Sequence, residues 1–166
     1  MEINNRHFLV ENEEKYNYVN KLQSIKPLLK LHHLKPYSEI ETGITESFLS
    51  IKGFFALCLF EKINAIMVDG RKIYEFVLDE TSPVHIIHHD TTTHVYSIEH
   101  DNSLANLEKY RTQYYKVQGF ESNPLKSITS YTLAELKDLC IKLNIAIDEP
   151  KQTKKDLYSR IVQTLI

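Results

Sequence analysis

Basic side chains gather near the carboxyl end of this 166-residue chain, at the expected start of its last helix. The stretch "EPKQTKKD" brings together Lys151, Lys154 and Lys155. A helix N-terminus attracts anions through its free backbone N–H groups and its dipole, so a phosphate would be held there by two effects. The surface would be widened by Lys137, Lys142, Arg160 and Tyr131, with the tyrosine against a sugar or base. About three to five phosphate contacts predict salt-sensitive, sequence-tolerant binding, roughly micromolar or weaker.

The eight histidines suggest a second kind of chemistry, because "HIIHHDTTTH" reads at first as a metal site. On a strand, His85 and His89 share one face while His88 and Asp90 share the other, so no three ligands converge locally. A hairpin would bring His94 back toward them. The alternatives to a metal site are a pH-sensitive or partner-contacting patch and ordinary histidines on a strand surface. The last is favoured, so no metal and no cofactor is predicted.

Signatures of catalysis are missing from the sequence. It has no Gly-rich phosphate loop and no Gly-x-Ser-x-Gly turn, and Cys58 and Cys140 sit among apolar neighbours, which predicts buried, reduced thiols. One catalytic alternative is a metal-dependent nuclease with carboxylates drawn from Asp69, Asp79, Glu80, Asp90, Glu99 and Asp101. Any acidic β-rich domain offers as many carboxylates, so we expect a protein that is not an enzyme.

Two short helices are expected to position the C-terminal lysines. Thr132 and Glu135 have the spacing of a capping box and precede a Leu-rich apolar face, which predicts a helix over 133–143. Thr153 and Asp156 repeat this spacing before the second helix. The intervening segment alternates apolar and polar residues and contains a proline, so it is expected to be extended.

This helix, extended segment and helix resemble the SAP motif and the N-terminal module of the transcription terminator Rho, which are small nucleic-acid-binding motifs. The resemblance covers residues 130–166. It rests on "TLAELKDLCIKLNI", in which Asn144 and Ile145 match a Gly-Leu pair, and on the Lys-x-x-Leu-x-x-Arg-Leu pattern of Lys154, Leu157, Arg160 and Ile161. The resemblance implies binding to nucleic acid, DNA more than RNA.

The first 120 residues are expected to combine helices with a β-meander. Apolar spacing predicts a helix over 11–31, broken at Pro27, then a connection and a short helix at "ITESFLS". A strand is predicted at "GFFALCLF", followed by a hairpin that turns at Asp69-Gly70. A second hairpin is predicted from "VHIIHH" to "HVYSIEH", which makes about four antiparallel strands. A helix is then predicted from a Ser103 N-cap to a Gly119 terminator.

The predicted class is therefore α+β, with an N-terminal helix, an antiparallel β-meander and a helix, followed by the SAP-like module. The predicted domains are a platform over 1–120, a linker over 121–129 and the module over 130–166. The formal net charge of −2 divides into −4 for residues 1–125 and +2 for 126–166, so the module alone leans toward a polyanion. The sequence begins with acidic residues and without the apolar run of a signal peptide, and it has no apolar stretch long enough to span a bilayer. It therefore predicts an intracellular protein that does not bind membranes.

Binding without turnover is the predicted function. The module would tether the chain to nucleic acid, and the N-terminal domain would bind a protein partner, in the nucleus or cytoplasm or inside a virus particle. A composition typical of AT-rich genomes favours a large DNA virus as the source. The alternative is a structural or assembly protein whose C-terminal helices dock on another protein, and the third is the nuclease.

Overall fold

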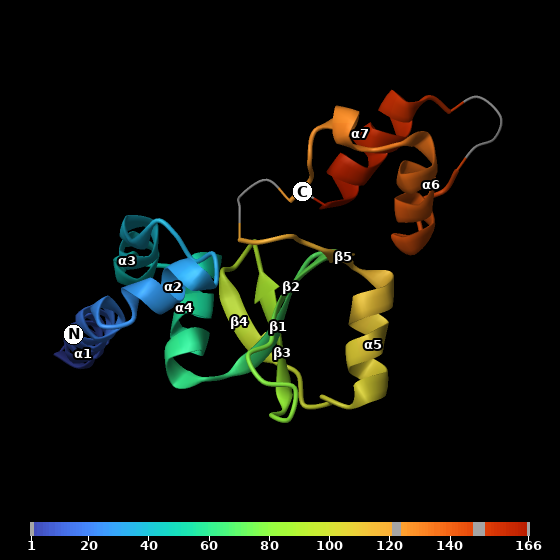
Figure 1. The fold of residues 1–166 in the computed structure, drawn as a ribbon. Helices are drawn as coiled ribbons and strands as arrows, with labels where there is room; N and C mark the ends of the chain where they lie inside the picture. Colours follow the sequence, from blue (N-terminus) through green and yellow to red (C-terminus); the bar gives the residue numbers. More distant parts are fainter. Residues whose placement is uncertain (1, 121–123, 148–151, 166) are drawn as a thin grey trace. The chain divides into compact units, whose positions relative to one another are not determined.

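The computed structural model describes residues 2–120, 124–147 and 152–165, with only the backbone of residues 2–6. The chain divides into two compact units, Met1–Asn64 and Ala65–Ile166. Helices and a five-stranded sheet are both present, which confirms the α+β class (Figure 1). The units divide where the sequence predicted no boundary. The division predicted over 121–129 involves residues outside the described ones and stays a prediction.

The first unit consists of helices. They are α1 (Glu2–Gln23), α2 (Lys26–Leu31), α3 (Tyr37–Thr45) and α4 (Ile51–Glu61). The predicted break near Pro27 is confirmed, because α1 ends at Gln23 and Pro27 lies in the first turn of α2. The predicted connection before Gly43 is wrong, because α3 forms there and buries Ile40 and Ile44, one turn apart on one face.

Helix α4 replaces the strand that was predicted for "GFFALCLF". The Ser50 hydroxyl caps this helix by accepting a hydrogen bond from the Gly53 N–H at 3.0 Å. Lys62 ends it in the left-handed conformation at φ 57°. The segment is apolar on every side, so its sequence carries no helical period. The short helix predicted at "ITESFLS" is also wrong, since α3 ends at Thr45 and α4 begins at Ile51.

Helices α3 and α4 approach closely at two glycines. A Cβ on Gly43 would lie 1.9 Å from the Ser50 Oγ, and one on Gly53 would lie 3.2 Å from the Gly43 carbonyl oxygen. The Ser50 N–H also donates to the Gly43 carbonyl at 2.9 Å. The cap of α4 therefore rests directly on the backbone of α3, which leaves no room for a side chain at Gly43.

The second unit is built on a mixed sheet. Its strands are β1 (Asn64–Asp69), β2 (Lys72–Phe76), β3 (Val84–Asp90), β4 (Val95–Ile98) and β5 (Tyr115–Lys116), in the order β4-β3-β1-β2-β5. Both predicted hairpins are confirmed: Asp69 pairs with Lys72 around Gly70 at φ 58°, and Asp90 pairs with Val95. The predicted set of four antiparallel strands is corrected to five, because β5 joins β2 in parallel.

Helix α5 (Leu104–Gln113) packs on one face of this sheet (Figure 1). The predicted Ser103 cap is confirmed, since its hydroxyl accepts the Asn106 N–H at 3.3 Å. The helix ends at Gln113 and not at Gly119, because the backbone beyond it pairs with β2, with the Tyr115 N–H donating to the Arg71 carbonyl at 3.0 Å. The core beneath the helix consists of Ile66, Val68, Ile73, Ile86, Leu107 and Tyr110.

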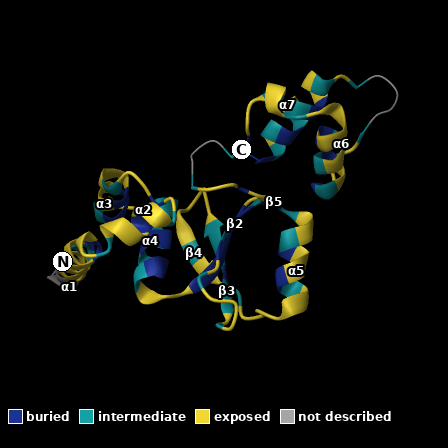
Figure 2. Cartoon of the chain, in the orientation of Figure 1, coloured by how far each residue is buried: buried dark blue, intermediate teal, exposed yellow. Residues whose placement is uncertain are grey.

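The C-terminal segment forms a 3-10 turn (Ile128–Ser130), α6 (Leu133–Lys142) and α7 (Lys154–Leu165). The predicted capping box of Thr132 and Glu135 is confirmed. Figure 2 shows buried positions on both α6 and α7. The buried residues of this segment include Leu136, Cys140, Leu143, Leu157, Ile161 and Leu165. Asn144, at φ 56°, occupies the left-handed position that ends a helix.

Cys58 and Cys140 are both free and buried, as the sequence predicted. Burial raises the pKa of the Cys58 thiol to about 12. Neither thiol is therefore in a setting that would make it a nucleophile.

Within the described part of the chain, no helix has the length and apolar character needed to cross a membrane.

Candidate nucleic-acid interface

The first turn of α7 presents two of the three predicted lysines. Lys155 is exposed and Lys154 half-buried, while Lys151 lies outside the described residues. The Thr153 N–H and hydroxyl donate to the Asp156 carboxylate at 2.9 and 2.7 Å, and the Asp156 N–H donates back to the Thr153 Oγ1 at 3.2 Å. These hydrogen bonds lower the pKa of Asp156. The helix start thus carries its own anion, so an incoming phosphate would rely on the two ammonium groups.

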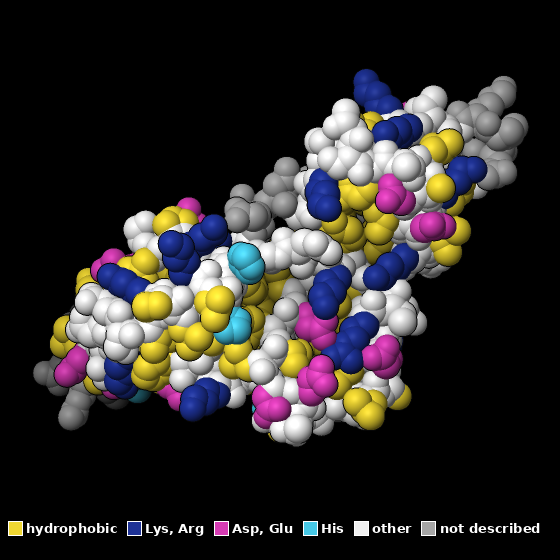
Figure 3. Space-filling view, viewed as in Figure 1, with side chains coloured by type: hydrophobic (Ala, Val, Ile, Leu, Met, Phe, Trp, Pro, Cys, Tyr) yellow, Lys and Arg dark blue, Asp and Glu magenta, His cyan; other side chains and the backbone are white. Residues whose placement is uncertain are grey.

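The other predicted basic residues are less available than the sequence suggested. Arg160 donates from Nη1 to the Ala146 carbonyl at 2.6 Å, which ties α7 to the segment that leaves α6. Lys137 and Lys142 lie on α6 and are half-buried. On the face drawn in Figure 3, Lys and Arg side chains are interspersed with Asp and Glu side chains. The interface therefore offers separate cations and not a continuous basic field.

Tyr131 makes contacts within the fold and is only partly available to a ligand. Its hydroxyl accepts the Lys126 N–H at 3.3 Å and lies 3.3 Å from the Tyr115 hydroxyl, and its ring lies 6.3 Å from that of Tyr158. The Tyr158 hydroxyl donates to the Lys126 carbonyl at 2.9 Å. Lys126, which precedes α6, is therefore held by two tyrosines: Tyr131 binds its N–H and Tyr158 binds its carbonyl.

A shallow groove of about 310 Å³ runs beside Tyr131. It is lined by Tyr115, Tyr131, Glu135, Asp138, Leu139 and Lys142. Two tyrosines and a leucine give the lining its aromatic and aliphatic part, and two carboxylates and one ammonium group complete it. Phosphates are repelled by the carboxylates, so this groove favours an apolar or basic peptide over nucleic acid.

Arg71, which the sequence did not single out, joins the sheet to α6. Its Nη2 donates to the carbonyls of Leu143 at 3.1 Å and Gln113 at 3.4 Å, and its guanidinium lies 4.9 Å from the centre of the Tyr114 ring. A cation at the C-terminal carbonyls of a helix is stabilising. Arg71 and Leu143 are 72 positions apart, so no local pattern reveals the contact.

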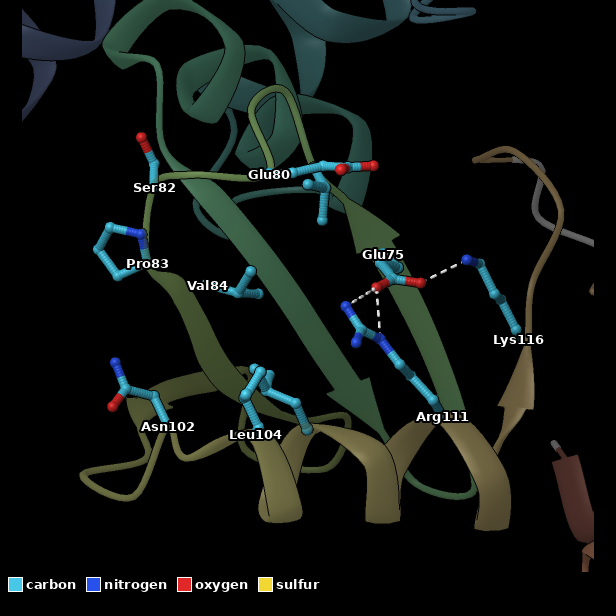
Figure 4. A pocket seen from close by; sticks show the side chains of 11 residues that line it. Glu75, Glu80, Ser82, Pro83, Val84, Asn102, Leu104, Arg111 and Lys116 are labelled. Carbon is cyan, nitrogen blue, oxygen red and sulfur yellow. Dashed lines mark hydrogen bonds and ion pairs between the residues drawn. The ribbon is translucent and has the colours of Figure 1, made fainter.

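A cavity of about 770 Å³ lies between the sheet and α5. Figure 4 shows Glu75 of β2 at its edge, reached by Arg111 from α5 and Lys116 from β5. Arg111 approaches Glu75 through Nε at 2.8 Å and Nη2 at 2.7 Å, and donates to Glu108 at 2.9 Å. Burial acts to raise the pKa of Glu75, but hydrogen bonds from Lys116 and Arg111 leave it lowered. The cations here are already neutralised, so the cavity is not an anion site.

The histidine-rich hairpin has the faces that the sequence predicted. His88 pairs with Ser97 and His89 pairs with Tyr96, so the two histidines point to opposite sides. The turn brings the His94 ring to 6.3 Å from that of His89. In the residues that the structure describes, no three His, Cys, Asp or Glu side chains are arranged to hold a metal ion.

Four of the carboxylates considered for a nuclease, Asp69, Asp79, Asp90 and Asp101, already have partners close to them in the fold. Asp69 is buried and pairs with Lys72 at 3.2 Å, with the His89 Nδ1 4.0 Å away. Three others accept backbone N–H groups in tight turns: Asp79 from Thr81, Asp90 from Thr92 and Thr93, and Asp101 from Ser103. These hydrogen bonds contribute to the lowered pKa values of the three turn carboxyls. Their geometry accounts for them as turn-forming residues.

Comparisons with known proteins add no assignment. No protein-family model, no characterised protein and no solved structure matches this chain. The SAP-like resemblance of residues 130–166 therefore stays a prediction. Function has to be argued from the side chains and their surroundings.

Proposed function

We propose that the chain is a nucleic-acid-binding adaptor, acting without turnover at its C-terminal module and binding DNA more than RNA. The observation that carries the proposal is the first turn of α7, where Lys154 and Lys155 have no ion-pair partner among the described residues. The capping bonds of Thr153 fix the backbone of this turn. The two ammonium groups therefore project from an ordered helix start, which suits phosphate contacts.

The expected affinity follows from the small number of cations. Each phosphate that is neutralised on duplex DNA adds about 0.9 to the slope of log affinity against log salt. Lys154 and Lys155 thus supply a slope of about 1.8, and Lys142 would raise it to about 2.7. Binding of this kind is weak at physiological salt and takes its specificity from another partner.

The N-terminal unit is the proposed protein-binding platform. Three consecutive residues of α1, Phe8, Leu9 and Val10, are 63%, 66% and 55% exposed. Clustered exposed apolar side chains are a property of protein-interaction surfaces, and these three lie within one turn of α1. An adaptor needs two binding surfaces, and this unit offers an apolar one while the module offers a charged one.

The test is a fluorescence-anisotropy titration of the intact protein with duplex DNA, single-stranded DNA and RNA over a range of salt. We expect the Lys154→Glu/Lys155→Glu variant to bind more weakly and to lower the salt slope by about 1.8. Glutamate in a first helical turn is favourable, so the fold is retained. The matched control is Lys30→Glu/Lys35→Glu, which changes the net charge equally at two exposed positions of the first unit. Equal losses in both variants, or no binding at low salt, would refute the proposal.

A second candidate function is docking of a protein on the C-terminal helices. It is favoured by the groove beside Tyr131, whose lining combines apolar side chains with Glu135 and Asp138. Binding of an apolar segment there would depend little on salt and would survive charge reversal at Lys154 and Lys155. Substitution of Leu139 by Asp would abolish it, whereas nucleic-acid binding at α7 would persist.

A further inference from the structure

A hollow of about 530 Å³ opens on the sheet beside the end of α5. Its lining consists of Val68, Gly70, His88, His89, Asp90, Thr93, Val95, Ser97 and Tyr114, from three strands, two turns and the residue after α5. No Lys or Arg side chain is among these residues. The hollow is separate from the lysines of α7 and from the cavity at Glu75, so it plays no part in the function proposed above.

His88, on one wall of the hollow, is held by a carboxylate. Its Nε2 lies 2.9 Å from the Glu99 Oε2, and the same oxygen accepts the Tyr110 hydroxyl at 2.8 Å. The hydrogen bonds from His88 and Tyr110 lower the pKa of Glu99, so this carboxyl is an ionised acceptor. An ionised Glu99 requires the proton of neutral His88 to sit on Nε2. The tautomer assigned by this network leaves Nδ1 as a lone-pair base.

Ser97 supplies a hydroxyl on the same face. It is the cross-strand partner of His88, and directly paired residues of an antiparallel ladder point to one side with Cβ atoms about 4.5–5.5 Å apart. The Glu99 N–H donates to the Ile86 carbonyl at 2.8 Å, which continues the same ladder. Glu99 is two positions after Ser97, so both side chains lie on the same face of the sheet. Ser97 is exposed, and its hydroxyl has no hydrogen-bond partner in the residues described.

We propose that Ser97, His88 and Glu99 form a hydrolytic site for small uncharged esters. The Ser97 hydroxyl oxygen attacks the ester carbonyl while its proton passes to the His88 Nδ1, and Glu99 stabilises the imidazolium from the other side. The alkoxide leaves with the proton from Nδ1. Water then adds to the acyl-serine by the same base, which releases the carboxylic acid and restores Ser97. Every atom comes from the ester and one water molecule, so no co-reactant is needed.

The lining sets the class of substrate. Val68, Val95 and Tyr114 give apolar walls, while the lack of cations and the presence of Asp90 disfavour an anionic ester. The exposed Ser97 hydroxyl suits a short acyl group. Apo spacing between nucleophile and base is often longer than a hydrogen bond and tightens when substrate binds. Tyr110, which does not face the hollow, is a positioning residue for Glu99.

Two measurements on the intact protein test the site. Turnover of p-nitrophenyl acetate should fall roughly 10²-fold or more in Ser97→Ala and in His88→Gln. A fluorophosphonate probe should attach at Ser97, located by mass spectrometry of the labelled peptide, and should fail to attach in His88→Gln. The control is His100→Gln, an exposed histidine outside the hollow, which should match the wild type.

Glu99→Gln separates a positioning role from a structural one. The substitution should lower kcat with little change in KM, because it removes the anion that sets the His88 tautomer and leaves the walls intact. Unchanged far-UV circular dichroism would show that the fold persists. Turnover that survives Ser97→Ala, or a probe attached anywhere except Ser97, would overturn the proposal.

Discussion

Glu75→Gln is expected to lower the free energy of unfolding of the second unit by more than most single substitutions near a protein surface do. The Glu75 side chain is 9% exposed and receives Arg111 and Lys116, which come from α5 and β5. The change keeps the volume and removes the charge, so two cations would face a neutral amide. The ion pairs at Glu75 therefore connect three elements, and their loss should be felt by all of them.

The magnitude follows from the exposure of the partners. Hydrogen bonds to charged groups contribute about 1.5–3 kcal/mol when shielded. Arg111 is 31% exposed and Lys116 54% exposed, so solvent screening places both interactions at the low end. The expected loss is about 2–3 kcal/mol, which lowers Tm by roughly 8–12 °C at about 4 °C per kcal/mol for a unit near 100 residues.

Scanning calorimetry at pH 7 and at pH 3 provides the assay. The folded-state pKa of Glu75 is lowered, so its contribution is present above the unfolded pKa of about 4.3 and is lost as pH falls through the folded value. The difference in Tm between the wild type and Glu75→Gln should therefore be smaller at pH 3 than at pH 7. Glu108→Gln is the control: this carboxylate also binds Arg111 but is 59% exposed, so about 0.5 kcal/mol or less is expected. A gap that is equal at both pH values, or equal in the two variants, would refute the reasoning.

Three further substitutions test the packing. Gly43→Ala should cost about 1–3 kcal/mol in thermal unfolding of the first unit, because its Cβ would lie 1.9 Å from the Ser50 Oγ. Thr132→Ala should cost about 1 kcal/mol by removing half of a capping box, with faster hydrogen exchange in the first turn of α6. Tyr158→Phe should cost about 1 kcal/mol and speed tryptic cleavage after Lys126, whose carbonyl loses its donor.

Two of these predictions have a matched control residue. Thr129, an exposed threonine of the preceding 3-10 turn, should tolerate alanine. Tyr16, which is 61% exposed, should tolerate phenylalanine without a change in cleavage. Wild-type melting of Gly43→Ala would mean that α3 and α4 can separate at this crossing, contrary to the contact described.

Elements that obey local rules could be predicted from the sequence. The capping residues Thr132, Thr153 and Ser103 each accept the N–H that their spacing predicts. The Asp69-Gly70 turn closes its hairpin because glycine adopts φ 58° there at no steric cost. In each case the deciding interaction joins residues three positions apart or less, so the sequence alone contains it.

Elements decided by burial or distant pairing could not be predicted. The segment 53–60 is apolar throughout, and both a buried helix and a buried strand fit such a run. Ser50 was the missed signal, since a serine before an apolar run is also a helix cap. Helix α5 stops at Gln113 because the next residues pair with β2, about 40 positions away in sequence. Helical spacing beyond Gln113 carried no information about that strand.

The predicted site residues divide in the same way. Lys154 and Lys155 lie where the helix pattern put them, whereas Tyr131 and Arg160 are engaged by Lys126 and Ala146. The Arg160 contact depends on how the chain returns on itself after α6, whereas Tyr131 is engaged within the segment that precedes α6. Composition and spacing therefore identify which side chains suit phosphate, but tertiary contacts decide which of them are available.

The contacts of α6 with the sheet bear on how the proposed function should be tested. Arg71 binds the carbonyl at the end of α6, and Tyr115 of β5 meets Tyr131 just before it. A chain cut before Pro124 would lose both contacts along with the lysines. Weak binding by such a truncation would then have two explanations, a damaged sheet or missing cations. Charge reversal at Lys154 and Lys155 leaves Arg71 and Tyr115 with their partners, so it isolates the contribution of the cations.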